Sequence, residues 1–388
     1  METRKLYYED PHTSRFTATV LTCQEAKGGW AVTLDATAFY PEGGGQAADT
    51  GTLGTVKVLH TREEGHQVVH LCDGPLTPGE AVEGIIDYAP RLRRMQQHTG
   101  EHMVSGIIHR RYGFHNTGFH MGSEIVTIDF DGIIPPEDLA DIEAEANAGV
   151  WQDLAVRCFV PDRSELEKTR YRTKRALPWP VRIVQVPGFD SCACCGTHVS
   201  RTGEVGLIKL FSAIPFRGGT RMEMACGISA LAVLNRAWEQ NKLVSQAFSV
   251  PVEETGAGAR RMNETLAELK YQITGLQRQI FRSIADGYAG RGNTLRLEPG
   301  LDGNGLRELA DLVAESCGGT AAIFSGDDQK GYSYCLAKRG GDLRQLGKTM
   351  NAALNGRGGG KPEFLQGRVS ACREAIETFF REQEETYV

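Results

Sequence analysis

Two short segments, nearly a hundred residues apart, each place two metal-binding side chains four positions apart. The first is His98-Thr-Gly-Glu-His102, and the second is Cys194-Cys-Gly-Thr-His198. On a helix, positions i and i+4 share a face, so the two histidines of the first segment can converge on one ion. Each pair alone is weak evidence, but the two segments together supply the nitrogen and sulfur ligands that Zn²⁺ prefers. The sequence therefore predicts one zinc ion per chain, bound by His98, His102, Cys194 and His198.

The number of side chains that bind at once decides what this expected site can do. If all four bind the ion, the coordination shell is closed and the zinc is structural. If one of them moves away, a water molecule can bind the ion and be activated. The spacing of the residues is compatible with both cases, so the sequence leaves open whether the zinc is structural or catalytic.

The length and composition are typical of a globular protein with more than one domain. A chain of 388 residues is longer than a single hydrophobic core usually accommodates, so the length predicts two or three domains. Hydrophobic residues make up 40% of the chain and charged residues 24%, and no apolar run approaches the roughly 18–20 residues of a membrane helix. The N-terminus is charged where a signal peptide would be apolar. We therefore expect a cytoplasmic protein with reduced cysteines and no membrane partner.

The charge distribution allows only local contacts with nucleic acid. A net charge of −6 argues against a broad nucleic-acid-binding surface. Two basic clusters precede the two metal-binding segments. They are Arg91, Arg93 and Arg94, and then Lys168, Arg170, Arg172, Lys174 and Arg175. Each cluster is compatible with a solvated face or with local phosphate contacts.

Helix and strand patterns are interspersed over the first 230 or so residues. Residues 1–88 are rich in short strand patterns. A helix expected from about 91 to 111 carries the first histidine pair, and strands are expected at 125–130 and 181–186. The second of these strands leads into the second metal-binding segment. Because no βαβ unit repeats, the pattern predicts an α+β fold.

The composition changes after about residue 228. Apolar residues then recur with spacings of mostly four and three, which is typical of a coiled coil or a helical hairpin. They are Met262, Leu266, Leu269, Ile273, Leu276, Ile280 and Ile284. We expect Gly256 and Gly258 to separate this helix from a preceding one. The last ninety or so residues return to a mixed α/β pattern, and their glycine run at 356–360 is no P-loop, because Pro362 replaces the required Ser or Thr.

Three further motifs accompany the metal-binding pairs in a fixed order. They are Thr37-Ala-Phe-Tyr-Pro-Glu-Gly-Gly-Gly-Gln46, Asp49-Thr-Gly51 and Thr202-Gly-Glu-Val-Gly206. Together with the pairs, they resemble the editing domain of alanyl-tRNA synthetases, and most of all the long form of the free-standing alanyl-tRNA editing proteins of the AlaX type. The similarity covers residues 1 to about 230, and the last ninety residues resemble the C-terminal domain of alanyl-tRNA synthetase. Cys195 departs from the family pattern, which has glycine there.

The patterns and the resemblance together divide the chain into four parts. We expect a β-barrel-like glycine-motif domain at 1–88 and an α+β zinc editing core at 89–228. A helical, coiled-coil-like linker is expected at 229–290. A mixed α/β C-terminal domain at 291–388 is expected to bind tRNA or to serve assembly.

The resemblance also implies an activity, namely hydrolysis of Ser-tRNA(Ala), and of Gly-tRNA(Ala), in trans. The expected partners are tRNA(Ala) mischarged with serine or glycine and, through the linker or the C-terminal domain, a second copy of the chain. By resemblance, Thr37 binds the seryl hydroxyl that alanine lacks, and Gln46 orients the substrate. Outside this family context, Thr37 would be an ordinary strand residue and Gln46 would only close a loop.

Two other functions are compatible with these residues. Glu101 completes His98-x-x-Glu101-His102, the inverted zinc-peptidase motif in which the glutamate is the general base. A peptidase of this type needs a downstream glutamate as third ligand, where this chain offers cysteine and histidine. The four-ligand set also fits a structural zinc domain that binds RNA without catalysis. A phosphoesterase is disfavoured, because the chain contains no Asp-His-His motif.

Overall fold

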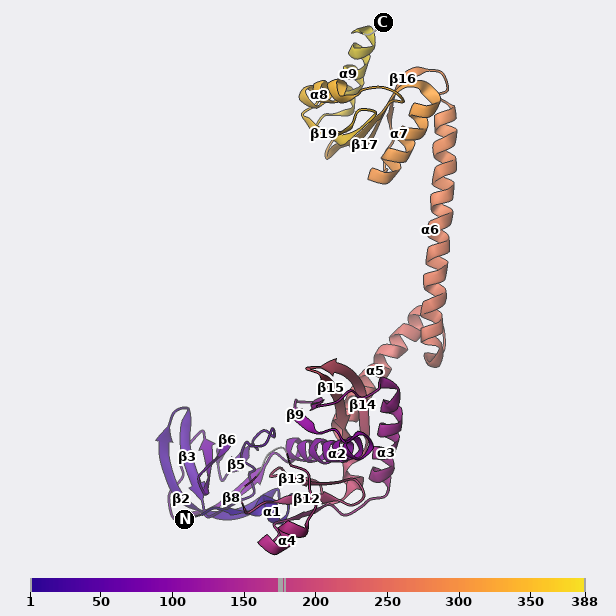
Figure 1. Ribbon diagram of the computed structural model, residues 1–388. Helices are drawn as coiled ribbons and strands as arrows, with labels where there is room; N and C mark the ends of the chain where they lie inside the picture. Colours follow the sequence, from indigo (N-terminus) through magenta and orange to yellow (C-terminus); the bar gives the residue numbers. More distant parts are fainter. Residues whose placement is uncertain (1, 174–176, 178, 387–388) are drawn as a thin grey trace. The chain divides into compact units, whose positions relative to one another are not determined.

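The computed structural model describes residues 2–173, 177 and 179–386, and the chain forms two compact units (Figure 1). The first unit is Met1–Leu243 and the second is Val244–Val388. Helices and strands are interspersed in both units, which confirms the expected mixture of the two. None of the described helices is both long and apolar enough to cross a membrane.

The first unit begins with a closed ring of antiparallel strands. They are β2 (Arg15–Ala26), β3 (Gly29–Leu34), β5 (Gly51–Leu53), β6 (Val56–Glu64), β7 (Gln67–Cys72) and β8 (Ala81–Ile86). The ring closes because β8 pairs with both β2 and β5. Val32 and Leu34 are two positions apart on β3, so both point into the apolar core of the ring. Outside the ring, α1 (Leu6–Glu9) follows β1 (Arg4–Lys5), which pairs in parallel with β4 (Ala36–Thr37).

A 25-residue helix, α2 (Tyr88–Tyr112), is the central element of the first unit. Two glycines let neighbouring elements touch its backbone. A Cβ atom at Gly100 would lie 2.3 Å from Sγ of Cys226, and one at Gly106 would lie 2.2 Å from the carbonyl oxygen of Phe189. Any larger residue at these two positions would push the neighbouring strands away.

Two antiparallel sheets pack against α2. The sheet of order β14-β15-β10-β9 consists of β9 (Asn116–Met121), β10 (Val126–Phe130), β14 (Ile208–Phe216) and β15 (Gly219–Cys226). The sheet of order β11-β12-β13 consists of β11 (Arg157–Phe159), β12 (Ile183–Val186) and β13 (Asp190–Ala193). The strands expected at 125–130 and 181–186 are thus present as β10 and β12. The short helices nearby are η1 (Pro136–Asp138), α3 (Leu139–Trp151), α4 (Arg163–Lys168) and η2 (Thr202–Val205).

The second unit combines a long helix with a five-stranded sheet. Helix α5 (Gly227–Phe248) leads into it, followed by η3 (Val252–Glu254) and the 32-residue α6 (Thr255–Asp286). The sheet has the order β16-β17-β18-β20-β19 and is antiparallel except for the β16–β17 pair. Its strands are β16 (Gly292–Leu297), β17 (Gly318–Asp327), β18 (Gly331–Ala337), β19 (Gly356–Lys361) and β20 (Phe364–Val369), and its helices are α7 (Gly303–Cys317), α8 (Arg344–Ala353) and α9 (Arg373–Thr386).

The break between the two long helices lies before the position expected from the sequence. Gly256 and Gly258 lie inside α6, so the expectation that they separate the helices is wrong. The chain turns instead at Ser249, whose φ is 53°, and at Pro251, which precedes η3. A left-handed residue and a proline interrupt a helix more strongly than isolated glycines do.

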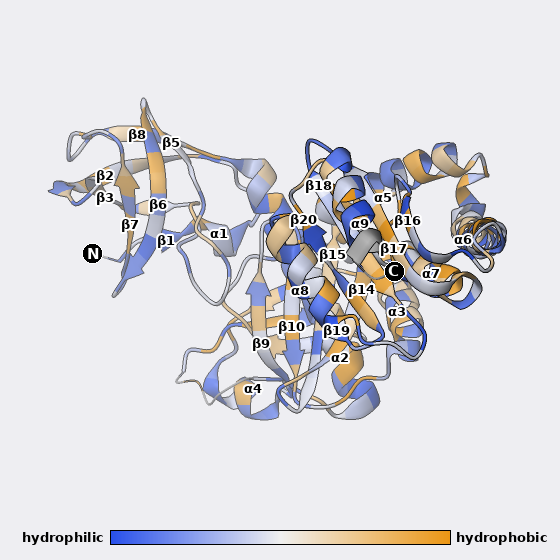
Figure 2. Ribbon diagram, turned by 90° about the horizontal axis from the view of Figure 1, so that it is seen from above, coloured by the Kyte–Doolittle hydropathy of each residue, from blue (hydrophilic) through white to orange (hydrophobic). Residues whose placement is uncertain are grey.

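The apolar seam expected along α6 is present and is exposed in the single chain. Exposed fractions of 48% to 62% are found for Met262, Leu266, Leu269, Ile273, Leu276 and Ile280. Figure 2 views α6 along its axis and shows hydrophobic and hydrophilic residues on the same helix. A seam of this kind needs a partner surface to become buried.

A fully buried ion pair joins the glycine-motif segment to α2. Arg91 donates from Nε to Asp49 Oδ2 at 2.9 Å, and both side chains have no exposed surface. The same carboxylate accepts a hydrogen bond from the backbone N–H of Tyr40 at 2.7 Å, and Arg91 also donates to the carbonyl oxygens of Pro11 and Ala38. Arg91 is therefore no part of a solvated basic face, because tertiary contacts with Asp49 bury it.

Asp49→Ala should lower the free energy of unfolding by about 3–5 kcal/mol, because it leaves the Arg91 guanidinium buried without its partner. Chemical denaturation followed by circular dichroism measures this loss. Glu9→Ala is the matched control, since it removes the carboxylate of an exposed pair with Arg4 and should change stability little. Equal losses in the two variants would contradict a special role for the buried pair.

Candidate metal centre

The fold brings together the four residues that the sequence selected as metal ligands. His98 and His102 lie on consecutive turns of α2, and Cys194 and His198 lie on the segment that follows β13. One potential ligand atom of each residue lies within 4.8 Å of those of the other three. Sγ of Cys194 is 3.4 Å from Nε2 of His98. The three histidines are buried, and Cys194 is partly exposed.

Local contacts hold the second metal-binding segment against the helix. The backbone N–H of Cys194 donates to the carbonyl oxygen of Arg182 at 3.1 Å, and that of Val199 donates to Oγ1 of Thr99 at 3.2 Å. A Cβ atom at Gly196 would lie 2.2 Å from the His98 ring. The glycine between the cysteine and histidine ligands is therefore required for the close approach of this segment to α2.

Each histidine ring is held from outside through its Nδ1 atom. The partners are Oε1 of Gln46 for His98 at 3.4 Å, Oδ2 of Asp190 for His102 at 2.8 Å, and Oγ1 of Thr99 for His198 at 3.4 Å. Such outer contacts fix the ring orientation and tautomer of metal-binding histidines. They leave the three Nε2 atoms free to face the cluster.

One buried nitrogen in the cluster has no hydrogen-bond partner. Nε2 of His198 is inaccessible to solvent, and none of the described residues donates to it or accepts from it. Buried polar atoms are nearly always paired, so an unpaired one calls for an explanation. A metal ion bound by Nε2 of His198, together with two further imidazoles and a thiolate, satisfies this atom.

The electrostatics of Cys194 and His198 favour the protonation states that metals bind, whereas for His102 the effect of burial is outweighed by Asp190 and Cys194, which hold its pKa well above the usual value. Burial opposes ionisation of the Cys194 thiol, but His98, His102 and His198 outweigh it and hold the pKa of Cys194 well below its usual value. Burial and the neighbouring His98 hold the pKa of His198 well below its usual value. The site thus offers a thiolate and a neutral imidazole, which are the forms that coordinate Zn²⁺.

Gln46 connects the glycine-rich loop to the metal-binding cluster. Its Nε2 donates to Oγ1 of Thr197 at 2.8 Å, and its Oε1 accepts from the backbone N–H of Thr197 at 3.1 Å. The neighbouring Gly45 has a φ of 87° and lies so close to the Phe119 ring that a Cβ atom would be 2.9 Å from it. That ring stacks on His98 at a centroid distance of 5.2 Å. The loop therefore forms one wall beside the cluster.

Thr37 ends β4, outside the strand ring, and its side chain reaches His70 on β7 of the ring. It is fully buried, and its Oγ1 accepts from the backbone N–H of Phe39 and lies 2.8 Å from Nε2 of His70. Nδ1 of His70 is 3.1 Å from the carbonyl oxygen of Val32, so Nδ1 carries the proton and the Thr37 hydroxyl donates to Nε2. Burial lowers the pKa of His70 to about 4, which keeps the ring neutral. Among the described residues, no member of the metal-binding set bonds to Thr37.

Glu101 and Cys195, which flank the expected ligands, both have other contacts. The buried carboxylate of Glu101 accepts hydrogen bonds from Oγ of Ser105 at 2.5 Å and from Nδ2 of Asn116 at 2.6 Å. The carbonyl oxygen of Cys195 accepts from the Tyr8 hydroxyl at 2.9 Å. Among the described residues, neither belongs to the group of four whose ligand atoms converge.

Two residues that position the ligands carried no signal in the sequence. Asp190 begins β13 and contacts both His102 and Arg172, whose guanidinium donates to the Asp190 carboxylate twice at 2.7 Å. Burial opposes ionisation of Asp190, but these two partners outweigh it and lower the pKa of its carboxyl group. Thr99 lies between the two histidines of α2 and contacts the second segment. Only the tertiary structure reveals either role.

Comparison with known proteins identifies related domains in three parts of the chain. Residues 4–89 match the model of the class II (A) tRNA synthetases, and residues 181–224 match the threonyl and alanyl tRNA synthetase second additional domain. Residues 290–387 match the DHHA1 domain. A solved structure, the C-Ala domain from Aquifex aeolicus alanyl-tRNA synthetase, is 18% identical, with a TM-score of 0.21, and covers 24% of this chain and 90% of that chain.

The curated relatives cover almost the entire chain. The alanine–tRNA ligases of Thermofilum pendens and Pyrococcus abyssi are each 32% identical over 96% and 98% of this chain, which spans 43% and 44% of their lengths. The alanyl-tRNA editing protein Aarsd1 of Mus musculus is 27% identical, and the match covers 96% of this chain and 95% of that protein. The chain thus spans less than half of the ligases. The matched domains and relatives confirm the resemblance read from the sequence: the chain is similar to an alanyl-tRNA editing protein over almost its whole length, and to the corresponding part of alanyl-tRNA synthetases.

Proposed function

We propose that this protein is a zinc-dependent hydrolase that deacylates Ser-tRNA(Ala), with Gly-tRNA(Ala) as a second substrate. The observation that carries the proposal is the convergence of three imidazoles and one thiolate, with the buried Nε2 of His198 left unpaired. The match to a protein named for alanyl-tRNA editing over 95% of its length supports the choice of substrate. A structural zinc protein that binds RNA without catalysis is the second candidate, and a chain that holds zinc but fails to deacylate would favour it.

The reaction breaks the ester between the amino acid and the terminal ribose of tRNA. Water adds to the carbonyl carbon, and the ribose oxygen leaves with a proton. When bound, zinc would supply a Lewis acid: with one of the four side chains displaced, or with a fifth coordination position open, it would lower the pKa of a bound water molecule to about 7 and polarise the carbonyl group. His98, His102, Cys194 and His198 would hold the ion, while Gln46, Asp190 and Thr99 keep the imidazoles oriented. Cys194 is the partly exposed member of the set, so substrate and water would approach from its side.

The peptidase alternative lacks support from the geometry of Glu101. A general base must reach the water that it activates, directly or through one further water molecule. The Glu101 carboxylate instead accepts hydrogen bonds from Ser105 and Asn116 in a buried network beside α2. We infer that Glu101 supports the helix and does not act as a base.

The wild-type protein should contain one zinc ion per chain and deacylate Ser-tRNA(Ala). The double variant His98→Ala/Cys194→Ala should lose the zinc and slow deacylation by about 100-fold or more, because both the ion and its positioned water are lost. Elemental analysis and a deacylation assay measure the two quantities.

Cys195→Ala is the matched control, because it removes the neighbouring thiol and should leave both quantities unchanged. A chelator should abolish wild-type activity, and added zinc should restore it. Full activity of the metal-free protein would contradict the zinc mechanism. Unchanged zinc in the double variant would contradict the ligand assignment.

We further propose that Thr37 discriminates serine from alanine. The hydroxyl proton of Thr37 is committed to His70, and one lone pair accepts from Phe39. The remaining lone pair can accept a hydrogen bond from a seryl hydroxyl, which an alanyl group cannot donate. A site that bonds a hydroxyl rejects the analogue without it far better than an apolar pocket does.

Thr37→Val should narrow the preference for Ser-tRNA(Ala) over Ala-tRNA(Ala) by roughly 5–150-fold, since a lost hydrogen bond is worth about 1–3 kcal/mol. Single-turnover rates on both substrates measure the change. Thr22→Val is the matched control, because Thr22 is a hydroxyl residue of the strand ring that pairs with Thr33 at 2.7 Å. An undiminished preference in Thr37→Val would restrict the role of this hydroxyl to holding His70.

We propose that the segment 291–388 contacts the body of tRNA and that 229–290 acts as a spacer. Six basic residues of the last segment were selected from the sequence, namely Lys338, Arg339, Arg344, Lys348, Arg357 and Lys361. Arg339 pairs with Asp311 and Arg344 with Asp342, whereas Lys338, Lys348, Arg357 and Lys361 form no ion pair with the described residues. The four unpaired residues are therefore the better phosphate contacts, and three of them are tested below.

The triple variant Lys348→Ala/Arg357→Ala/Lys361→Ala should raise KM for tRNA and leave kcat unchanged, because phosphate contacts act equally in ground and transition states. Its KM should also depend less steeply on salt concentration. The ion-paired Arg339→Ala/Arg344→Ala variant is the control. Unchanged KM and salt dependence would contradict tRNA binding by this segment and assign it to assembly. The exposed seam of α6 would then join two copies of the chain, and light scattering would detect the dimer.

A further inference from the structure

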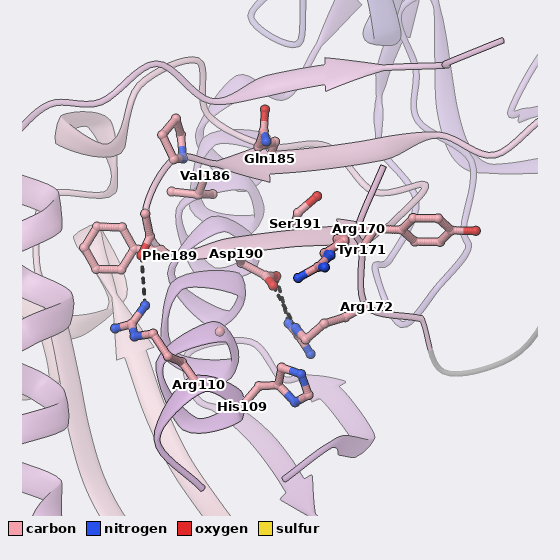
Figure 3. A pocket seen from close by; sticks show the side chains of 13 residues that line it. His109, Arg110, Arg170, Tyr171, Arg172, Gln185, Val186, Phe189, Asp190 and Ser191 are labelled. Atoms are coloured by element: carbon pink, nitrogen blue, oxygen red, sulfur yellow. Dashed lines mark hydrogen bonds and ion pairs between the residues drawn. The ribbon is translucent and has the colours of Figure 1, made fainter. Parts of the chain in front are cut away.

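A pocket lies beside the candidate metal centre, with Asp190 between them. It has a volume of about 450 Å³ and is lined by the end of α2, by residues 170–172 and by the hairpin that joins β12 to β13 (Figure 3). Asp190 lines this pocket and also contacts the metal-site residue His102. We call it the arginine pocket after Arg110, Arg170 and Arg172, which line it.

Two of the three arginines are neutralised by carboxylates, and the third is not. Arg110 pairs with Glu145, and Arg172 pairs with Asp190. Arg170 is exposed and forms no hydrogen bond or ion pair with any of the described residues. Glu145 also pairs with Arg111, so two carboxylates face four guanidinium groups in and beside the pocket. The pocket therefore has an excess positive charge, and Arg170 is the lining arginine without a carboxylate partner among the described residues.

Ser191 and Gln185 also line the pocket, but their side chains lie on another face of the strands than Asp190. Oγ of Ser191 is inaccessible to solvent and has no partner among the described residues. Ser191 lies opposite Gln185 in the β12–β13 pairing, so both side chains project from the same face of the sheet. Asp190 is the neighbour of Ser191 on β13 and therefore projects from the opposite face. In Figure 3, Arg170 and Arg172 lie on the side of Asp190, whereas Ser191 and Gln185 project from the other side of the strands. The two guanidinium groups therefore meet beside Asp190, and the Ser191 hydroxyl is turned away from them.

We propose that the arginine pocket binds a phosphate group. Arg170 supplies charge-assisted hydrogen bonds, for which phosphate is a preferred acceptor of arginine. Arg172 is shared between the bound phosphate and Asp190, so the ligand lies two side-chain contacts from His102. The phosphate can come from free phosphate or from the backbone of an RNA strand that enters the metal centre. The RNA source rests on the proposed editing function, whereas the phosphate site does not.

The sequence pattern had already marked this region as basic. Arg170 and Arg172 belong to the cluster that precedes the second metal-binding segment, and Lys174 and Arg175 of that cluster lie outside the described residues. The structure separates the two described arginines by role, since Arg172 is held by Asp190 and Arg170 remains available.

Titration of the full-length protein with inorganic phosphate, against chloride at constant ionic strength, tests the site by calorimetry. We expect saturable binding at one site. Arg170→Ala should weaken it by about tenfold or more, because it removes a charged donor to the anion, whereas Ser191→Ala should leave it unchanged, because this hydroxyl faces away from the arginines. Arg15→Ala, at an exposed arginine of the strand ring, is the control and should bind phosphate as the wild type does. Non-saturable binding, or undiminished binding by Arg170→Ala, would overturn the proposal.

A second arm identifies the source of the phosphate. A single-stranded RNA oligonucleotide that ends in CCA should compete with inorganic phosphate in the wild type, and Arg170→Ala should raise KM for tRNA. Phosphate binding without competition by RNA would support the site and assign it to free phosphate. Phosphate binding is measured without any deacylation. A protein that binds phosphate but does not hydrolyse Ser-tRNA(Ala) would therefore contradict the proposed function and still support the phosphate site.

Discussion

The buried ion pair between Asp49 and Arg91 determines how the parts of the first unit meet. It fixes the glycine-motif segment on α2, and the same segment carries Gln46 to the His98 ring. Removing two charges from water is costly, so such a pair persists only where further hydrogen bonds satisfy both groups. The backbone of Tyr40 and the carbonyl oxygens of Pro11 and Ala38 supply these bonds. The orientation of the first histidine of the cluster thus depends on an ion pair that does not involve the four expected ligands.

In the candidate metal centre, the expected ligands are held in place by a second set of side chains. Four ligand atoms converge, and behind them an amide, a carboxylate and a hydroxyl each hold one imidazole. The carboxylate of Asp190 is in turn held by Arg172, which lines the arginine pocket. This arrangement links a proposed phosphate site to a proposed metal site through two side chains. A hydrolase acting on the end of a nucleic acid needs both features close together, because phosphate contacts position the strand whose terminal ester is cleaved.

Much of the candidate site could be predicted from the sequence, because its signals are local. The spacing of His98 and His102, and the short motif Cys194-Cys-Gly-Thr-His198, were enough to predict which side chains converge. The seam of α6 likewise follows from periodicity. The burial of Arg91 could not be predicted, since it depends on Asp49 from another element, and neither could Asp190, which the β12–β13 hairpin brings to His102. The pairing of Thr37 with His70 depends on strand register, which short motifs do not specify.

The central claim is that one ion is held by one thiolate and three imidazoles. X-ray absorption spectroscopy of the zinc-loaded protein tests it directly, because sulfur and nitrogen ligands give different distances. The account predicts one sulfur at about 2.3 Å and three nitrogens at about 2.0–2.1 Å. It further predicts loss of the sulfur contribution in Cys194→Ser. Two or more sulfur ligands, which would bring in Cys192 or Cys195, or a shell of oxygens alone, would contradict it.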